Sequence, residues 1–278
     1  MIPVRSKSAV GLALVGLSLL IGDDVRADAV VTFDNGTEGW IGPQGPGGST
    51  TVDPQGGHPG ANLHTIFSNF GITFHNSSNG AFVGDYTQSQ TVALSIDVKV
   101  QDISFFGTPV SRPWLVDLRD FDNPEPGFPW TSVWFKFADI SLAQHGDWTT
   151  FTVLIEDTSA VDLPPGWGGT GAETPQAEPI LPPNRTFTDV LAGIDEIAFT
   201  TFEPGFVFGE TQFDVRLDNI AITTGGPAVP VPAISTWGMI VLALLALTAG
   251  TVVFARGGSC VGMGQDVVSP LRLHGLGA

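Results

Sequence analysis

Short segments in which apolar and polar residues alternate constrain the fold of this chain most strongly. In "TVALSIDVKV", five apolar residues are each separated by one residue: Val92, Leu94, Ile96, Val98 and Val100. A period of two places successive side chains on opposite faces of a β-strand, so that one face is buried and the other is wet. The segments "SVWFKFADI", "TTFTVLIE" and "QFDVRLDNIAIT" alternate in the same way. All four are predicted to be half-buried strands.

The remaining strand signals are spread over residues 28–224 and are separated by turns rich in glycine and proline. The chain has 35 Gly and 21 Pro, and only 14% of its residues are charged. Many short strands without a long amphipathic helix are typical of an antiparallel sandwich. We expect an all-β ectodomain, an antiparallel jelly-roll β-sandwich of about ten strands. The further expected strands are "AVVTFD", "GITFHN", "AFVGDY", "WLVDLRDF" and "EIAFTTF".

Departures from regular strands are also predicted. In "QFDVRLDNIAIT" the alternation changes phase at Asp218 and Asn219, which indicates a β-bulge. Two long segments, "IGPQGPGGSTTVDPQGGHPGAN" and "DTSAVDLPPGWGGTGAETPQAEPILPPNRT", are expected to be loops. Loops of this length are uncommon in compact domains and are either functional or disordered.

The acidity of the chain limits its partners. The formal net charge is −17, and the only acidic residues outside residues 28–224 are Asp23, Asp24 and Asp266. A domain this acidic repels phosphate groups, which argues against a nucleic-acid partner and against electrostatic binding to anionic lipid. Cys260 is the single cysteine, so the chain cannot form an intramolecular disulfide.

Both ends of the chain have the composition of targeting segments. Arg5 and Lys7 precede an apolar run and small residues, which is the layout of a secretory signal peptide. Near the C-terminus, a charge-free apolar stretch is long enough to span a bilayer and is followed by Arg256. A helix buried in the core is the alternative at each end. The expected parts are a signal peptide at 1–27, a Gly/Pro linker at 225–233, a transmembrane sorting helix at 234–255 and a tail at 256–278.

The stretch "VPAISTWGMIVLALLALTAGTVVFAR" resembles the IPTL-CTERM sorting signal of Gram-negative bacteria, which joins a proline motif and a Trp-Gly pair to a spanning helix and a basic end. The matching positions are Val231, Pro232, Ala233, Ile234, Trp237 and Gly238, with Arg256 after the helix. The resemblance implies an exported protein that is anchored transiently in the inner membrane and processed by an exosortase-type transpeptidase. It would then reach the cell surface or the extracellular space. Retention of the helix as a permanent anchor is the alternative.

The segments "FDNGTEGW" and "VRLDNIAI" resemble the edges of laminin B-type and carbohydrate-binding jelly rolls. Such domains often hold a structural calcium between their first and last strands, and Asp34 and Asp218 match those positions. Calcium takes six to eight oxygen ligands, so backbone carbonyls would have to contribute. The alternative is that both residues cap turns. A second acidic segment, "DLRDFDNPEPG", lacks EF-hand spacing and is expected to be a solvated loop.

The tryptophans divide into two predicted groups. Trp40, Trp114 and Trp148 have apolar neighbours and are predicted for the core, whereas Trp130, Trp134 and Trp167 are predicted for loops or a wet strand face. An exposed indole ring offers a flat apolar face on which a sugar ring can stack. Trp130 and Trp134 are therefore the candidate ligand-binding residues, with core packing as the alternative.

Catalytic motifs are missing from the sequence. "GWGGTG" satisfies G-x-G-x-x-G, but it follows Pro164-Pro165 instead of a strand, so we expect a loop and not a nucleotide site. The nucleophile-elbow and H-E-x-x-H patterns are also absent. We expect an exported, surface-sorted, non-catalytic protein with extracellular polysaccharide or matrix as its candidate partner. The alternatives are a secreted carbohydrate-active enzyme, whose carboxylate pair a sequence cannot reveal, and a structural or adhesive surface protein that self-associates.

Overall fold

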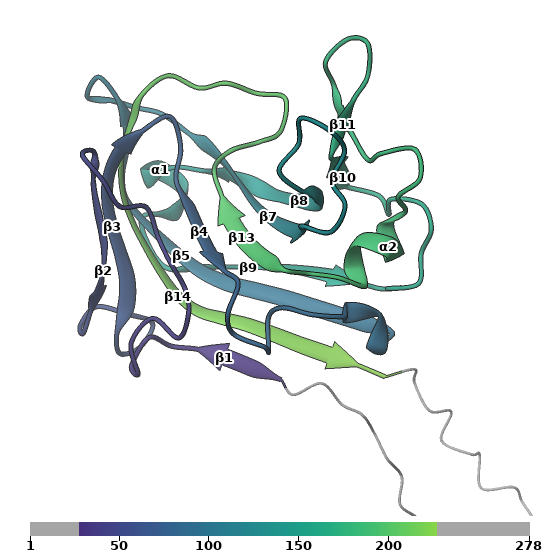
Figure 1. Cartoon of the computed structure of the whole chain (residues 1–278). Coiled ribbons are helices and arrows are strands. Elements are labelled where there is room, and N and C mark those ends of the chain that lie inside the picture. The colour runs from purple at the N-terminus through teal and green to yellow at the C-terminus, as the bar shows by residue number, and fades with distance from the viewer. Residues whose placement is uncertain (1–27, 227–278) are drawn as a thin grey trace, which may run out of the picture. The chain divides into compact units, whose positions relative to one another are not determined.

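Two antiparallel sheets dominate the computed structural model, which describes residues 28–226 (Figure 1). Sheet A contains β1 (Ala29–Val31), β2 (Gly48–Asp53), β3 (Asn62–Asn69), β5 (Thr91–Phe105), β6 (Thr108–Pro109), β9 (Thr149–Ile155) and β14 (Thr211–Gly225). Sheet B contains β4 (Thr73–Asn76), β7 (Arg112–Asp120), β8 (Thr131–Ile140), β10 (Trp167–Thr170) and β13 (Glu196–Thr200). The other elements are β11 (Ala172–Glu173), β12 (Pro179–Ile180), the 3₁₀ turn η1 (Tyr86–Gln88), α1 (Leu142–His145) and α2 (Phe187–Leu191).

The strand order of sheet A is β2–β3–β14–β5–β6, with β1 paired to β14 and β9 paired to β5. Sheet B has the order β10–β8–β7–β13–β4, and β11 pairs only with β12. Every strand pair is antiparallel. The prediction of an all-β antiparallel sandwich is therefore confirmed.

The core lies between the two sheets and is built by the alternation seen in the sequence. The five apolar residues of "TVALSIDVKV" are all fully buried on β5. On β14 the buried set starts with Phe213, Val215 and Leu217 and resumes with Ile220 and Ile222. The register between β14 and β5 shifts after Asp218. The predicted bulge is thus confirmed, and Asn219 within it has a positive φ of 48°.

One predicted strand does not form. The segment "AFVGDY" folds as turns followed by η1, although Phe82 and Tyr86 are fully buried. Side chains hold these turns: Asn79 Oδ1 accepts from the Ala81 N–H at 3.1 Å, and Asp85 Oδ1 accepts from the Thr87 N–H at 2.9 Å. Such local side-chain bonds compete with the hydrogen bonds of a strand.

Both segments that were expected to be loops contain strands, so those predictions are wrong in part. β2 lies in the first segment, and β10, β11 and β12 lie in the second. The "GWGGTG" motif is an edge strand and not a loop, since its residues 167–170 pair with β8. Glycine permits this pairing because a Cβ on Gly168 would lie 2.3 Å from the ring of Trp134, and one on Gly169 would lie 2.4 Å from Leu181.

The first and last described strands lie side by side. β1 pairs with β14 from Ala29↔Ile222 to Val31↔Ile220, and Asp28 Oδ1 accepts from the Thr224 N–H at 3.1 Å. The predicted signal peptide, sorting helix and tail, and most of the linker, lie outside the described residues. Between residues 28 and 226, no helix has the length and apolar character needed to cross a membrane.

Candidate functional site

One face of sheet B is turned away from the core and carries polar side chains. Arg119 on β7 lies opposite Glu196 on β13 and opposite Ser132 on β8, while Asp117 lies opposite Trp134. Cross-strand partners, and residues two apart on a strand, share one face of a sheet. The intervening residues of the same strands belong to the hydrophobic core: Val116, Leu118, Val133 and Ile197. We call the face with Arg119 the outer face of sheet B.

A hydrogen-bonded chain of polar and charged side chains crosses this outer face. Glu196 accepts from Arg119 Nη1 at 2.6 Å through Oε1, and its Oε2 lies 2.7 Å from His75 Nδ1. Arg119 Nε also donates to Asp117 Oδ2 at 2.7 Å. Burial alone would raise the pKa of Glu196, but the hydrogen bonds from His75 and Arg119 outweigh it and lower that pKa below its ordinary value. Glu196 is therefore an anion at neutral pH.

Trp130 joins this network from the segment that precedes β8. The Arg119 guanidinium lies over the indole ring, 4.3 Å from its centroid, in a cation–π contact. Trp130, Arg119, Glu196 and His75 all line one cleft of about 520 Å³. The other lining residues are Gly42, Pro43, Gln44, Phe67, Asn69, Gly71, Thr73 and Phe202. We call this the sheet B cleft, and its size is that of a small-ligand site.

Two polar atoms on the outer face have no hydrogen-bond partner within the described part of the chain. Asp117 Oδ1 and Trp134 Nε1 are both buried, and their residues face each other across β7 and β8. A buried polar group without a partner costs about 1–3 kcal/mol. Both atoms lie below the surface of the outer face, and neither residue lines the sheet B cleft.

The two candidate ligand-binding tryptophans lie at β8: Trp134 on the strand and Trp130 in the residue before it. Trp130 lines the sheet B cleft, whereas Trp134 lies on the same outer face, packed over Gly168, but is not among the lining residues. The predictions for the other tryptophans are confirmed in part. Trp40 and Trp114 are fully buried, as predicted. Trp167 was predicted to be exposed, which is wrong, because it is only 9% exposed and packs on Phe135 and Phe187.

The prediction for Trp148 is also wrong, because this residue is more exposed than expected. Predicted for the core, it is only partly buried, and its ring stacks on that of His58 with centroids 5.7 Å apart. His58 Nδ1 lies 2.8 Å from Asp97 Oδ2. This aromatic pair is not among the residues that line the sheet B cleft.

Asp34 and Asp218, the candidate calcium ligands, hold the same loop. Asp34 Oδ1 accepts from the Ala61 N–H at 3.0 Å, and Asp218 Oδ2 accepts from the His58 N–H at 2.5 Å. Burial raises the pKa of Asp218, and the charges of Asp97 and Asp34 raise it further, against the hydrogen bonds from His58 and Asn219. Asp218 is thus a buried carboxyl group whose negative charge is opposed by its surroundings.

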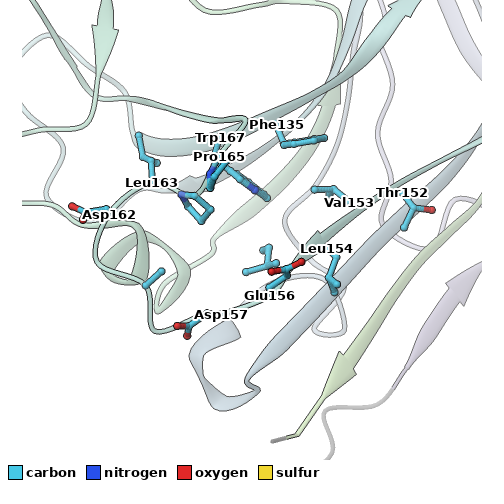
Figure 2. Close-up of a pocket in the computed structure, with 13 residues that line it drawn as sticks. Phe135, Thr152, Val153, Leu154, Glu156, Asp157, Asp162, Leu163, Pro165 and Trp167 are labelled. Carbon is cyan, nitrogen blue, oxygen red and sulfur yellow. The ribbon is translucent and has the colours of Figure 1, made fainter. Parts of the chain in front are cut away.

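A second cavity, of about 540 Å³, lies beside β9 (Figure 2). Residues 152–157 of β9 and its continuation form one wall. Leu163, Pro165 and Trp167 lie on the opposite side in Figure 2. Since none of its lining residues belongs to the sheet B cleft, the two cavities are separate.

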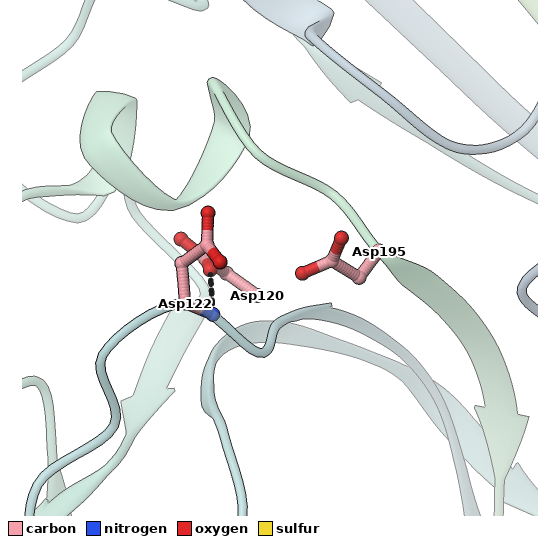
Figure 3. Close-up of side chains that lie close together, drawn as sticks. All are labelled: Asp120, Asp122 and Asp195. Atoms are coloured by element: carbon pink, nitrogen blue, oxygen red, sulfur yellow. Dashed lines mark hydrogen bonds between the residues drawn. The ribbon is translucent and has the colours of Figure 1, made fainter.

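Three carboxylates, Asp120, Asp122 and Asp195, form the one acidic group in the described residues whose oxygens all lie within 4.8 Å (Figure 3). Arg185 already donates to Asp120 through Nη2, and the Phe121 N–H donates to Asp195 Oδ2 at 2.7 Å. The guanidinium of Arg185 therefore already supplies a positive charge to this cluster.

The prediction of a solvated acidic loop over "DLRDFDNPEPG" is wrong for its first four residues, 117–120, which include two of its acids. Asp117 and Asp120 belong to β7, and they are only 6% and 3% exposed. Each is paired with an arginine, Arg119 for the first and Arg185 for the second. Asp122 and Glu125, beyond the end of the strand, are exposed as predicted.

Comparison with known proteins gives similarities of structure alone. No protein-family model matches the chain, and no curated protein matches it in sequence. Among solved structures, it is similar to the family 11 carbohydrate-binding module of cellulosomal cellulase Lic26A-Cel5E of Clostridium thermocellum. That match has a TM-score of 0.43 at 14% identity and covers 73% of this chain and 98% of the module.

Two further similar structures are a second carbohydrate-binding module and a carbohydrate esterase. The family 22 carbohydrate-binding module of Clostridium thermocellum Xyn10B has a TM-score of 0.38 at 10% identity, over 72% of this chain and 96% of the module. The carbohydrate esterase vb_24B_21 from Shiga toxin-encoding bacteriophage phi24B has a TM-score of 0.39 at 11% identity, over 73% of this chain and 99% of its own. These values are too low to carry a function from those proteins to this chain.

Proposed function

We propose that this protein is a non-catalytic glycan-binding β-sandwich of the jelly-roll type, and that its ligand lies in the sheet B cleft. One observation carries the proposal. A single cleft brings together the indole of Trp130 and the hydrogen-bonded groups of His75, Glu196 and Arg119. An aromatic face and a few fixed polar groups are what a polyhydroxy ring needs for stacking and orientation.

The charges in the cleft favour a neutral glycan over an acidic one. Arg119 already donates to Asp117 and Glu196, so an incoming carboxylate or sulfate would find this guanidinium occupied. The formal net charge of the whole chain, −17, would repel such a polymer as well. Neutral hydroxyl groups can instead bond to the remaining lone pairs of Glu196, the carboxylate that lines the cleft.

The same network argues against glycoside hydrolysis in this cleft. A glycosidase needs one carboxyl group whose pKa is raised, so that it can protonate the leaving oxygen. The pKa of Glu196 is lowered instead, and Arg119 binds both carboxylates that could form the pair. A binding role is therefore the better proposal, and the carbohydrate-active enzyme is the alternative.

Binding to a panel of insoluble and soluble neutral polysaccharides tests this function, with polyuronates included as charged polymers. Trp130→Ala should weaken binding to any neutral hit about tenfold, the equivalent of ~1.4 kcal/mol. Trp148→Ala is the matched control, because Trp148 is a partly buried tryptophan outside the cleft. If the folded protein binds nothing on the panel, the alternative of a structural protein that self-associates would be favoured.

Calcium at Asp34 and Asp218 is proposed as a structural ion for this domain. Asp218 is fully buried, and two neighbouring carboxylates, Asp34 and Asp97, oppose its ionisation. A cation there would relieve this repulsion, and each carboxylate keeps lone pairs beyond those bonded to backbone N–H groups. The acidic group of Figure 3 is less suited, since Arg185 already neutralises part of its charge.

Export and sorting are proposed from the composition of the two ends. The signal peptide at 1–27 and the motif with Pro232, Ile234, Trp237, Gly238 and Arg256 support an exported protein processed by an exosortase-type transpeptidase. Mass spectrometry of the mature protein tests this. A C-terminus before Ile234 is expected, and intact peptides from 234–254 would instead indicate a retained membrane anchor.

A further inference from the structure

The cavity beside β9, which the proposed glycan site does not use, lies along a sheet edge with a free side. β9 pairs with β5 on one side, from Val98↔Thr149 to Val92↔Ile155. On its other side it has no strand partner among residues 28–226. The cavity lies at this edge, because it is lined by residues 152–155 of the strand together with Leu163, Pro164 and Pro165 of the loop that follows.

The sequence of this edge lacks the usual protection against pairing. Proteins commonly guard an exposed edge strand with lysine, proline or a bulge. β9 reads TTFTVLI and has none of these, and its register with β5 is continuous. The apolar side chain of Leu154 is 50% exposed and lines the cavity. An additional extended segment can therefore pair with β9 and place side chains in the cavity.

The charges that line the cavity have one sign. Glu156, Asp157 and Asp162 all line it, and Figure 2 shows Asp157 and Asp162 at one end, away from Thr152 and Phe135. No lysine, arginine or histidine is among the lining residues. The rest of the lining is largely apolar, and Trp167, the aromatic best suited to a sugar, is packed against Phe135 and Phe187. A peptide with a basic side chain therefore fits this cavity better than a glycan does.

We infer that the β9 edge and its cavity bind an extended peptide segment of a partner protein, in which apolar residues are followed by a lysine or arginine. The peptide backbone adds a strand to sheet A, its apolar side chains lie against Leu154 and Leu163, and its cation lies among Glu156, Asp157 and Asp162. This site is independent of the sheet B cleft, so the protein can hold a glycan and a protein partner together.

A random peptide library displayed on phage provides the probe. The purified full chain is used as bait, and the dissociation constants of selected synthetic peptides are then measured by calorimetry. Peptides that combine apolar residues with Lys or Arg should be enriched. Amide hydrogen exchange in β9 should slow when such a peptide binds, because the free edge becomes hydrogen-bonded.

Surface variants make the test specific. Leu154→Lys and the double variant Glu156→Lys/Asp162→Lys change exposed side chains and should weaken binding at least about tenfold. Ile66→Lys is the matched control, since Ile66 is similarly exposed, at 58%, on β3. Selected peptides without enriched basic residues, or equal affinity for the cavity variants and the control, would overturn the inference. It would also be overturned if the cavity variants reduced polysaccharide binding instead.

Discussion

Glu196 on β13 and Arg119 on β7 are joined across sheet B by a 2.6 Å hydrogen bond between Oε1 and Nη1. The two side chains are among the least exposed charged groups of the sandwich, and their positions in the chain are 77 residues apart. Both residues line the proposed glycan site, so removal of this ion pair should affect both folding and binding.

Glu196→Gln should lower the free energy of unfolding by roughly 2 kcal/mol at neutral pH. The loss is smaller than the 3–5 kcal/mol expected for a fully orphaned buried charge, because Asp117 still pairs with Arg119. Urea unfolding measures it, and Glu125→Gln in an exposed loop is the control. Equal stability of the two variants would contradict the role given to this pair.

The pH dependence of stability follows from the lowered pKa of Glu196. Because the folded-state pKa lies below the ordinary value of 4.5, the group stabilises the fold fully above that value. This stability is lost as the pH falls through the folded-state pKa. Stability curves at decreasing pH should therefore show an acid limb that is shallower in Glu196→Gln. An unchanged limb in the variant would show that Glu196 is not held ionised by His75 and Arg119.

Gly168→Ala should displace Trp134 from its place on the outer face of sheet B. An added Cβ would lie 2.3 Å from the indole ring, so either the ring or β10 has to move, at a cost of about 1–3 kcal/mol. Gly80→Ala is the control, because nothing lies within 4 Å of a Cβ at that position. Thermal melting and the indole N–H signal of Trp134 in ¹⁵N spectra report the change. A Gly168→Ala variant with an unchanged melting temperature and signal would contradict the packing described.

Calcium should raise the melting temperature more at neutral pH than at pH about 4. The pKa of Asp218 is raised in the folded state, so its ionisation destabilises the fold as the pH rises through that value. A bound cation offsets this cost only when the carboxylate is ionised. Asp218→Ala should abolish the gain, whereas Asp122→Asn should keep it. The reverse pattern would place the ion in the acidic group of Figure 3.

Much of the fold was predictable because period-two alternation is a local property. It placed β5, β8, β9 and β14 and even the bulge at Asp218, where the alternation changes phase. It failed for β10, because Gly168 and Gly169 have no side chain with which to show an alternation. Glycine is required at both positions because a Cβ would clash with Trp134 or Leu181. Those contacts join residues distant in the chain and cannot be read from the sequence.

The candidate site was less predictable, since its parts come from separate strands. Trp130 could be found as an aromatic residue in a polar context, but the network of His75, Asp117, Arg119 and Glu196 was missed. A weak signal was present, because Asp117 and Arg119 are two residues apart in a strand and so share a face. Their pairing with Glu196 depends on the strand order β7–β13–β4, which is set by the topology.

The most direct test of the central claim is a titration of the ¹⁵N-labelled protein with a neutral oligosaccharide from the polysaccharide panel, following the indole N–H signals. We predict a saturable shift for Trp130, which lines the sheet B cleft. Trp40 and Trp148 should stay unchanged. Shifts confined to Trp148 or Trp167, or no shift with any neutral oligosaccharide, would contradict a glycan site in the sheet B cleft.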